Sequence, residues 1–118
     1  MSTSTQYAMN YSHSYIPESD IPRTTPIFQH LVDTYASETN KLASVWSELR
    51  DHQLEFRPHT RSSSIRQILV HQILSERRFF GEFLGLAELE PDVLLPPGNQ
   101  PSVKAYVERV VGLARSRL

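Results

Sequence analysis

Residues 62–86, SSSIRQILVHQILSERRFFGEFLGL, decide the fold because they predict a long amphipathic helix with recognisable start and stop signals. Ser64 and Gln67 have the Ser-x-x-Gln spacing of a capping box, in which each side chain bonds a backbone N–H group that the helix start leaves unpaired. Gly85 tolerates the left-handed backbone conformation of a C-terminal cap. Between them, apolar residues recur every three or four positions: Ile65, Ile68, Leu69, Ile73, Phe80, Phe83 and Leu84. The stretch predicts a helix over about residues 64–85.

An earlier helix start lies at Thr25 and Pro26. Threonine is a favoured N-cap, and proline at the first helical position loses no hydrogen bond. The apolar residues that follow alternate spacings of three and four, the pattern of a helix packed lengthwise against others: Val32, Tyr35, Thr39, Leu42, Trp46 and Leu49. Four more residues widen this stripe and favour burial against several neighbours: Leu31, Ala36, Ala43 and Val45. A helix is predicted over about residues 25–50.

The C-terminal helix follows a break in the pattern. Residues 88–99 contain too many prolines for a helix interior, and Pro101 reopens a helix as Pro26 does. The helix over about residues 101–118 has one apolar face: Val103, Tyr106, Val107, Val110, Val111 and Ala114. No strand-like alternation occurs. The sequence therefore predicts an all-α, up-down helical bundle over residues 23–118, preceded by a flexible arm at residues 1–22 that has no helical period.

Composition and charge narrow the classes of function. The 118 residues carry 12 basic and 13 acidic side chains scattered along the chain, so no charge excess favours binding to nucleic acid or to an anionic membrane. Because there is no cysteine, a disulfide, a thiolate metal ligand and a thiol nucleophile are excluded. The N-terminus has no basic region followed by an apolar run, and no apolar stretch is long enough to span a bilayer. We expect a cytoplasmic protein.

Three stretches resemble the DinB family, the damage-inducible four-helix bundles of the YfiT type. They are HLVDTYASETNKLASVW at residues 30–46, LEFRPHTRSSSI at residues 54–65, and IRQILVHQILSERRFFGEFLG at residues 65–85. The resemblance covers about residues 24–118. It implies a divalent-metal-dependent hydrolase or a transferase of low-molecular-weight thiols, with zinc or nickel as the metal. The small-molecule substrate is not indicated.

His71 matches the family's metal-binding histidine in the second helix. The family's other two ligands form a His-x-x-x-His pair on a fourth helix, and this chain has no such pair. The resemblance therefore implies an incomplete site and a chain that stops before the fourth helix, either as a shortened product or as a natural remnant. From the pattern alone, His71 lies about 160° from the centre of the apolar stripe, where a histidine is ordinarily a solvated surface residue.

The neighbours of His71 are the remaining candidates for a site. Ser75 and Arg78 lie on the same polar flank as His71. Glu76 falls near the centre of the apolar face, where an unpaired carboxylate is costly, so we expect it to pair with an arginine or to lie at an interface or site. Arg78 is either a solvated residue or a group that orients an anionic substrate near a metal.

Two classes of function follow from these observations. The first is a metal-dependent enzyme of the DinB type, with His71 as a ligand. The second is a non-catalytic helical module that dimerises or binds a partner. A bundle that lacks one helix exposes apolar flanks on its neighbours, and such patches are usually buried by a partner. We expect a homodimer, as DinB family members often are.

Overall fold

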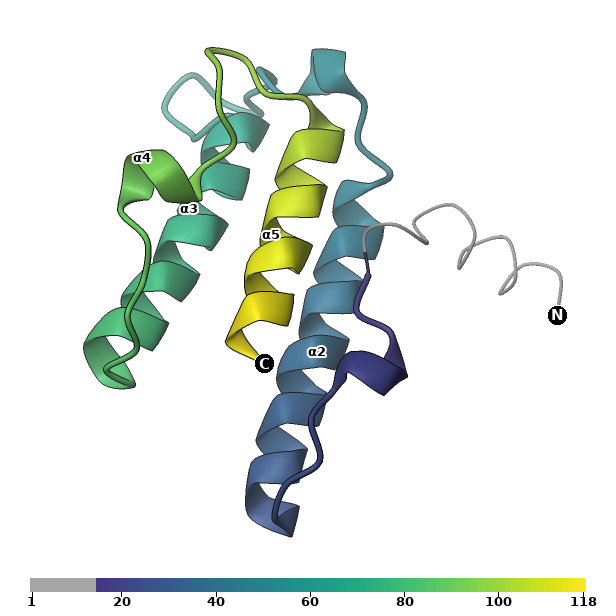
Figure 1. Ribbon diagram of the computed structural model, residues 1–118. Helices are drawn as coiled ribbons and strands as arrows, with labels where there is room; N and C mark the ends of the chain where they lie inside the picture. Colours follow the sequence, from purple (N-terminus) through teal and green to yellow (C-terminus); the bar gives the residue numbers. More distant parts are fainter. Residues whose placement is uncertain (1–14) are drawn as a thin grey trace, which may run out of the picture. The chain divides into compact units, whose positions relative to one another are not determined.

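The computed structural model describes residues 15–118, and every regular element in that range is a helix. The predicted all-α class is confirmed for this range. In chain order the elements are η1 (Glu18–Asp20), α2 (Pro26–Trp46), η2 (Asp51–Gln53), α3 (Ile65–Arg78), η3 (Phe79–Phe83), α4 (Pro91–Leu94) and α5 (Val103–Arg117) (Figure 1). The three long predicted helices correspond to α2, α3 with η3, and α5.

The described residues form two compact units, which are considered separately. Unit 1 contains the residues up to Glu48 together with Val107–Leu118, and unit 2 contains Leu49–Tyr106. The helix α5 therefore contributes its first turn to unit 2 and its remainder to unit 1.

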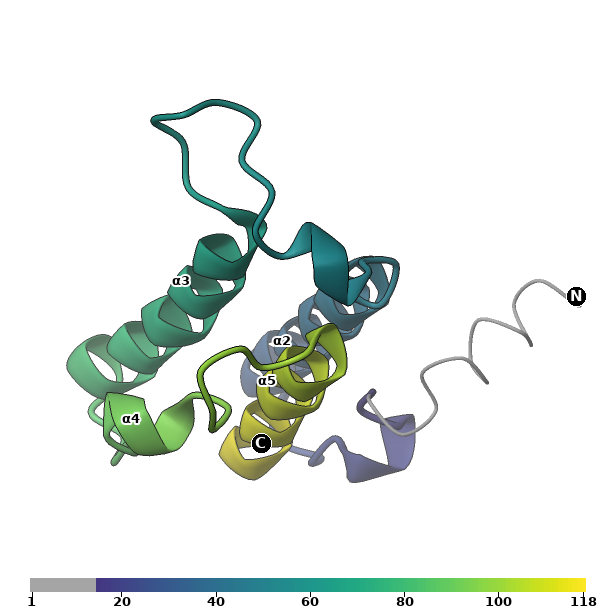
Figure 2. The same cartoon turned by 90° about the horizontal axis from the view of Figure 1, so that it is seen from above.

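Unit 1 is built from α2 and the later part of α5, which lie side by side in two perpendicular views (Figures 1 and 2). The predicted start of α2 is confirmed, with Thr25 as the N-cap and Pro26 in the first turn. The Thr25 side chain makes no capping bond, however. The Gln29 side chain instead binds the segment that leads into the helix. Its Oε1 accepts from the Thr24 N–H group, and its Nε2 donates to the Pro22 carbonyl oxygen.

The buried stripe of α2 is narrower than predicted. Its buried residues are Ala36, Thr39, Ala43 and Trp46, which recur at spacings of three and four. Leu31 and Val45, which we expected to widen the stripe, are 57% and 66% exposed, so that expectation was wrong. Residues at the edges of the apolar arc of a helix stay in solvent where no neighbouring element covers them.

The segment before α2 is attached to unit 1. Ile16 is buried, and the Asn40 side chain bonds both of its backbone groups: the Ile16 N–H donates to Asn40 Oδ1 at 2.7 Å, and Asn40 Nδ2 donates to the Ile16 carbonyl at 3.0 Å. Arg115 of α5 forms an ion pair with Asp20 of η1. Residues 15–20 of the predicted arm are thus held by α2 and α5. Residues 1–14 of that arm lie outside the described residues.

All six residues of the predicted apolar face of the C-terminal helix are buried in α5: Val103, Tyr106, Val107, Val110, Val111 and Ala114. A face of valine, alanine and tyrosine at helical spacing removes a continuous apolar strip from water. The helix ends at Arg117, whose guanidinium donates to the Tyr35 hydroxyl on α2 at 3.1 Å.

Unit 2 begins with η2 and a connection that is bonded to the start of α3. The Ile65 N–H donates to the Phe56 carbonyl, and the Arg66 N–H donates to the Leu54 carbonyl. Leu54 is fully buried at the base of this connection.

One short helix was not predicted. Pro91 opens α4 at its first turn, where a missing N–H group costs nothing, so a proline-rich stretch still forms four helical residues beside α3 (Figures 1 and 2).

Candidate functional site

The start of α3 has the predicted capping box. The Gln67 N–H donates to Ser64 Oγ at 3.2 Å, and the Ser64 N–H donates to Gln67 Oε1 at 2.9 Å. Ser64 is itself buried, and Leu69 and Ile73, one and two turns further on, are 1% and 0% exposed. This half of the helix is therefore fixed by both hydrogen bonds and packing.

His71 lies on the exposed side of α3, as its position on the polar flank predicts. Its Nε2 atom is 3.2 Å from Ser75 Oγ, one turn along the helix. Ser75 is exposed as well, so this pair faces solvent. The structure thus brings together His71 and one of its three predicted neighbours.

The other two predicted neighbours have partners of their own. The Gln72 side chain donates to Glu76 Oε2 at 2.8 Å, so this carboxylate is hydrogen-bonded on the helix surface. Glu76 is half-buried rather than central to the buried face. Arg78 forms an ion pair with Glu82 at 3.1 Å, and both side chains are mainly exposed. Such an exposed pair contributes little to stability.

The end of the α3 helix departs from regular α geometry. Phe79–Phe83 form a π-helical turn, in which the Leu84 N–H bonds the Phe79 carbonyl five residues back, at 3.3 Å. A π-type turn followed by a glycine in the left-handed conformation is a common way for an α-helix to end. No sequence signal indicated this turn. The nearest one is the spacing of Phe79 and Phe83, which places two large apolar side chains on one side of the helix.

Two phenylalanines of this turn are exposed. Phe79 is 50% and Phe83 is 75% exposed, and their ring centroids are 5.9 Å apart. Phe79 also meets Phe80 edge-on at 5.3 Å. Leu84 and Leu86 are exposed beside them. An apolar cluster that remains in solvent is the feature of a folded chain that most often marks an interaction surface.

Gly85 ends the helix as predicted, with a φ of 70°. This left-handed conformation carries no Cβ penalty in glycine. The Leu86 N–H then bonds back to the Phe80 carbonyl at 2.9 Å, which holds Leu86 against the end of the turn. The exposed apolar residues are therefore presented by a fixed backbone.

A hollow of about 240 Å³ lies next to this turn. Its lining mixes charges of both signs with one leucine and one glycine: Arg77, Arg78, Gly81, Glu82, Leu86 and Glu88. The Arg77 guanidinium donates to the Leu89 carbonyl at 2.6 Å, and Arg78 is paired with Glu82, so both arginines of the lining already have partners within the chain. The hollow is small and open, and no group is poised in it for acid–base or nucleophilic chemistry.

Unit 1 has a larger open hollow of about 470 Å³ between α2 and the segment at residues 16–21. Its polar lining includes Asn40 and Lys41. The Asn40 side chain is hydrogen-bonded to the Ile16 backbone, and Lys41 forms an ion pair with Glu38 at 3.2 Å. Because these two polar side chains already have partners within the chain, this hollow resembles a seam between packed segments.

Arg66, at the start of α3, ties three segments of unit 2 together. It pairs with Glu55, donates to the Pro101 carbonyl at 2.8 Å and to the Tyr106 hydroxyl at 3.1 Å, and lies 5.8 Å from the Tyr106 ring centroid. The hydrogen bond with Glu55 is the main reason that the pKa of the Arg66 guanidinium is raised above its ordinary value. This arginine has a structural role that its sequence context did not reveal.

Within residues 15–118, no three histidine, aspartate or glutamate side chains lie close enough together to hold a metal ion. His30, His52 and His59 are each exposed, and His13 lies outside the described residues. Comparisons with known proteins found no matching family model, no similar curated protein and no similar solved structure. Among the helices of the described range, none has both the length and the apolar content needed to cross a bilayer.

Proposed function

We propose that this chain is a helical association module that pairs with a second copy of itself through one side of α3 and η3. This side, the outer face, consists of Ile68, Gln72, Ser75, Phe79 and Phe83. The observation that carries the proposal is the exposure of the two phenylalanines on a rigid, capped helix.

The spacing of these residues places them on one side of the helix. Successive members are three or four residues apart, which returns the chain to the same face at about 100° per residue. Leu69 and Ile73 lie on a different side and are fully buried. The helix therefore has two apolar sides, of which one is buried.

The exposed apolar area around the outer face is close to the area that the centre of a dimer interface buries. With about 150–250 Å² for each whole phenylalanine, the exposed fractions of Phe79 and Phe83 leave on the order of 250 Å² in solvent. Ile68, Leu84 and Leu86, each about half exposed, enlarge the patch to about 400 Å² or more. A stable dimer buries about 800 Å² on each partner, so this patch supplies about half and the flanking polar residues the remainder.

The polar groups on and beside the outer face are compatible with burial in a dimer. Gln72 is bonded to Glu76, and Ser75 is bonded to His71. These local bonds lower the cost of removing the side chains from water. Because the same face is present on every copy, two faces can meet across a two-fold axis as antiparallel helices.

The mass of the intact protein in solution tests this proposal. Light scattering over a range of micromolar concentrations is expected to give twice the 13.6 kDa chain mass. Phe79→Ser combined with Phe83→Ser is expected to give the monomer mass at the same concentrations, because the centre of the interface becomes polar. A wild-type protein that stays monomeric at every concentration would contradict the proposal.

A matched control distinguishes a specific interface at the outer face from nonspecific hydrophobic association. Ile27 and Phe28, at the start of α2, are 77% and 59% exposed. Ile27→Ser combined with Phe28→Ser removes a similar exposed apolar area from unit 1 and is expected to leave the dimer intact. If this variant dissociates the dimer and the Phe79/Phe83 variant does not, the interface has been assigned to the wrong surface.

A metal-dependent activity of the DinB type is a second proposal. It is supported by the solvent-exposed imidazole of His71, which offers a ring nitrogen at the position of the family's ligand. A tight site needs further ligands beyond the described residues or from another molecule, because one histidine holds zinc weakly. On this proposal, protein loaded with zinc or nickel retains one metal per chain after dialysis, and His71→Ala loses it. Equal metal contents in the two proteins would refute it.

A further inference from the structure

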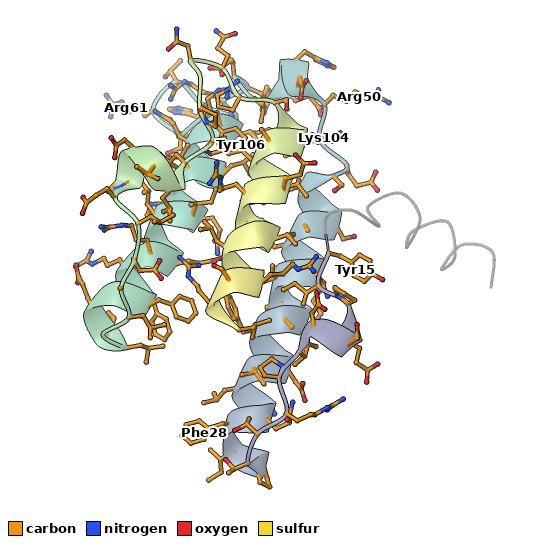
Figure 3. The ribbon with its side chains drawn as sticks, viewed as in Figure 1. Tyr15, Phe28, Arg50, Arg61, Lys104 and Tyr106 are labelled. Atoms are coloured by element: carbon orange, nitrogen blue, oxygen red, sulfur yellow. The ribbon has the colours of Figure 1, made fainter. Side chains whose placement is uncertain are left out.

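Four cationic side chains lie toward one end of unit 2, although they are scattered along the sequence. This basic end consists of Arg50, Arg57, Arg61 and Lys104, all of which are exposed. Figure 3 shows Arg50, Arg61 and Lys104 toward the same end of unit 2 as Tyr106, with Arg61 and Arg50 on opposite sides of it. None of the four forms an ion pair with another residue of the described range.

Backbone and side-chain bonds bring these positions together. Asp51 Oδ1 accepts from the Val103 N–H at 2.8 Å, which places Arg50 and Lys104 on either side of a bonded pair. Arg66 links the start of α3 to residues 101–106. The connection that carries Arg57 and Arg61 is bonded to the same helix start through Phe56 and Leu54.

Two acidic residues of unit 2 near these cations already have partners. Asp51 accepts the Val103 N–H, and Glu55 pairs with Arg66. Neither carboxylate is bonded to any of the four cations, so the basic end keeps a local charge excess even though the whole chain carries a net charge of −1. At physiological ionic strength a charge is felt over about 8 Å, so a ligand at this end responds mainly to the local cations.

The loop that carries two of the arginines is internally bonded. Arg57 Nη1 donates to the Ser62 carbonyl at 2.7 Å, and Ser62 Oγ accepts from the His59 N–H at 3.0 Å. The Arg61 N–H donates to His59 Nδ1 at 3.1 Å, which leaves Nε2 of the neutral ring as the N–H donor. A loop held by its own bonds loses little entropy when it binds a partner.

We propose that the basic end binds an acidic segment of another protein through its aspartate and glutamate carboxylates. Guanidinium groups donate two parallel hydrogen bonds to a carboxylate, and three of the four cations are arginines. Phe56, next to Arg57, is 57% exposed and offers an apolar contact within the segment.

The observations favour a short acidic peptide over single-stranded nucleic acid. Proteins that bind single strands stack successive bases on several aromatic side chains, and this loop exposes one. A long polyanion also extends beyond the basic end and meets the acidic residues that give the chain its negative net charge. A peptide of about ten residues avoids this repulsion.

Fluorescence anisotropy with the full chain tests the proposal. The probes are a fluorescein-labelled peptide of twelve glutamates, a twelve-residue glutamine peptide and a twelve-nucleotide oligouridylate. At low ionic strength the glutamate peptide is expected to bind, with an affinity that falls as salt is added, and the glutamine peptide is expected not to bind. Failure of the wild type to bind the glutamate peptide, or tighter binding of the oligouridylate, would overturn the proposal.

Substitutions locate the binding surface. Arg50→Glu combined with Arg61→Glu is expected to weaken peptide binding at least tenfold, because neither side chain makes a structural ion pair. Arg23→Glu combined with Lys41→Glu changes the net charge equally in unit 1 and is expected to change binding less than twofold. Equal losses in the two variants would overturn the assignment.

Circular dichroism checks that the variants fold. If the Glu variant at Arg50 and Arg61 loses helicity, Arg50→Gln combined with Arg61→Gln provides the test and is expected to weaken binding several-fold. A folded Gln variant that binds as tightly as the wild type would also refute the proposal.

Discussion

The two ends of the helix formed by α3 and η3 differ in how their apolar residues are used. At the start, a reciprocal capping box leads into Leu69 and Ile73, which are completely removed from water. At the end, a π-turn presents Phe79 and Phe83 to solvent. Apolar residues recur at helical spacing at both ends, but the two pairs lie on different sides of the helix. Periodicity therefore predicts that a helix forms and which residues share a side, whereas the presence of a neighbour decides whether that side is covered.

The largest difference between the two ends should appear in stability. Leu69→Ala is expected to lower the free energy of unfolding by about 2–5 kcal/mol, because it leaves a cavity at a fully buried position. Phe83→Ala removes a larger side chain from the exposed end and is expected to change the stability of the monomer by about 0.5 kcal/mol or less. Urea unfolding at low protein concentration measures both. Similar losses would mean that Phe83 is packed within the chain.

The end of the helix has its own backbone requirement. Gly85→Ala is expected to cost about 1–2 kcal/mol, because an alanine at a φ of 70° brings its Cβ close to the backbone. Apart from Gly85 and the two residues adjacent to it, no atom lies within 4 Å of the added Cβ, so the cost comes from the local backbone conformation. Gly112→Ala is the matched control, since this position within α5 is equally open and its φ is not positive. It is expected to stabilise the protein by about 1 kcal/mol. Thermal or urea unfolding of the two variants should therefore shift in opposite directions.

The start of the helix depends on one hydroxyl. Ser64→Ala removes the acceptor of the Gln67 N–H group and is expected to lower the free energy of unfolding by about 1 kcal/mol. Ser63→Ala, one residue earlier and exposed, is expected to have no measurable effect. Urea unfolding of the two variants compares them directly, and equal stabilities would show that the Ser64 cap does not stabilise the helix.

The smallest change in stability is expected at His71. Alanine is a better helix former than histidine, and the exposed imidazole contacts only Ser75 among the hydrogen bonds described. His71→Ala should therefore leave the free energy of unfolding unchanged or raise it by a few tenths of a kcal/mol. A loss above about 1 kcal/mol would show that His71 is part of the packed structure.

The signals that predicted the fold are local in the sequence. The capping box at Ser64, the start at Pro26, the left-handed Gly85 and the face of α5 depend on neighbouring residues along one helix, and the structure confirms each of them. The width of the α2 stripe could not be predicted, because the exposure of Leu31 and Val45 depends on how many neighbours the helix has.

The features of the candidate surfaces are not local. The π-turn has no established sequence signature, and the gathering of Arg50 and Lys104 depends on a bond between Asp51 and Val103, 52 residues apart. The sequence placed His71 correctly on an exposed flank. It placed Glu76 on the apolar face, and in the structure this half-buried carboxylate accepts a hydrogen bond from Gln72.

Cysteine cross-linking tests the central claim, that the outer face of α3 and η3 pairs with a second copy, most directly. The chain has no cysteine of its own, so a single introduced thiol can react only with the same position on another copy. Ser75 lies midway between Ile68 and Phe83, and a two-fold axis through the outer face brings it near its counterpart. Mild oxidation of Ser75→Cys is expected to give a covalent dimer in high yield, while Glu38→Cys, exposed on α2, stays monomeric. No covalent dimer from Ser75→Cys, or equal yields from the two variants, would contradict the account.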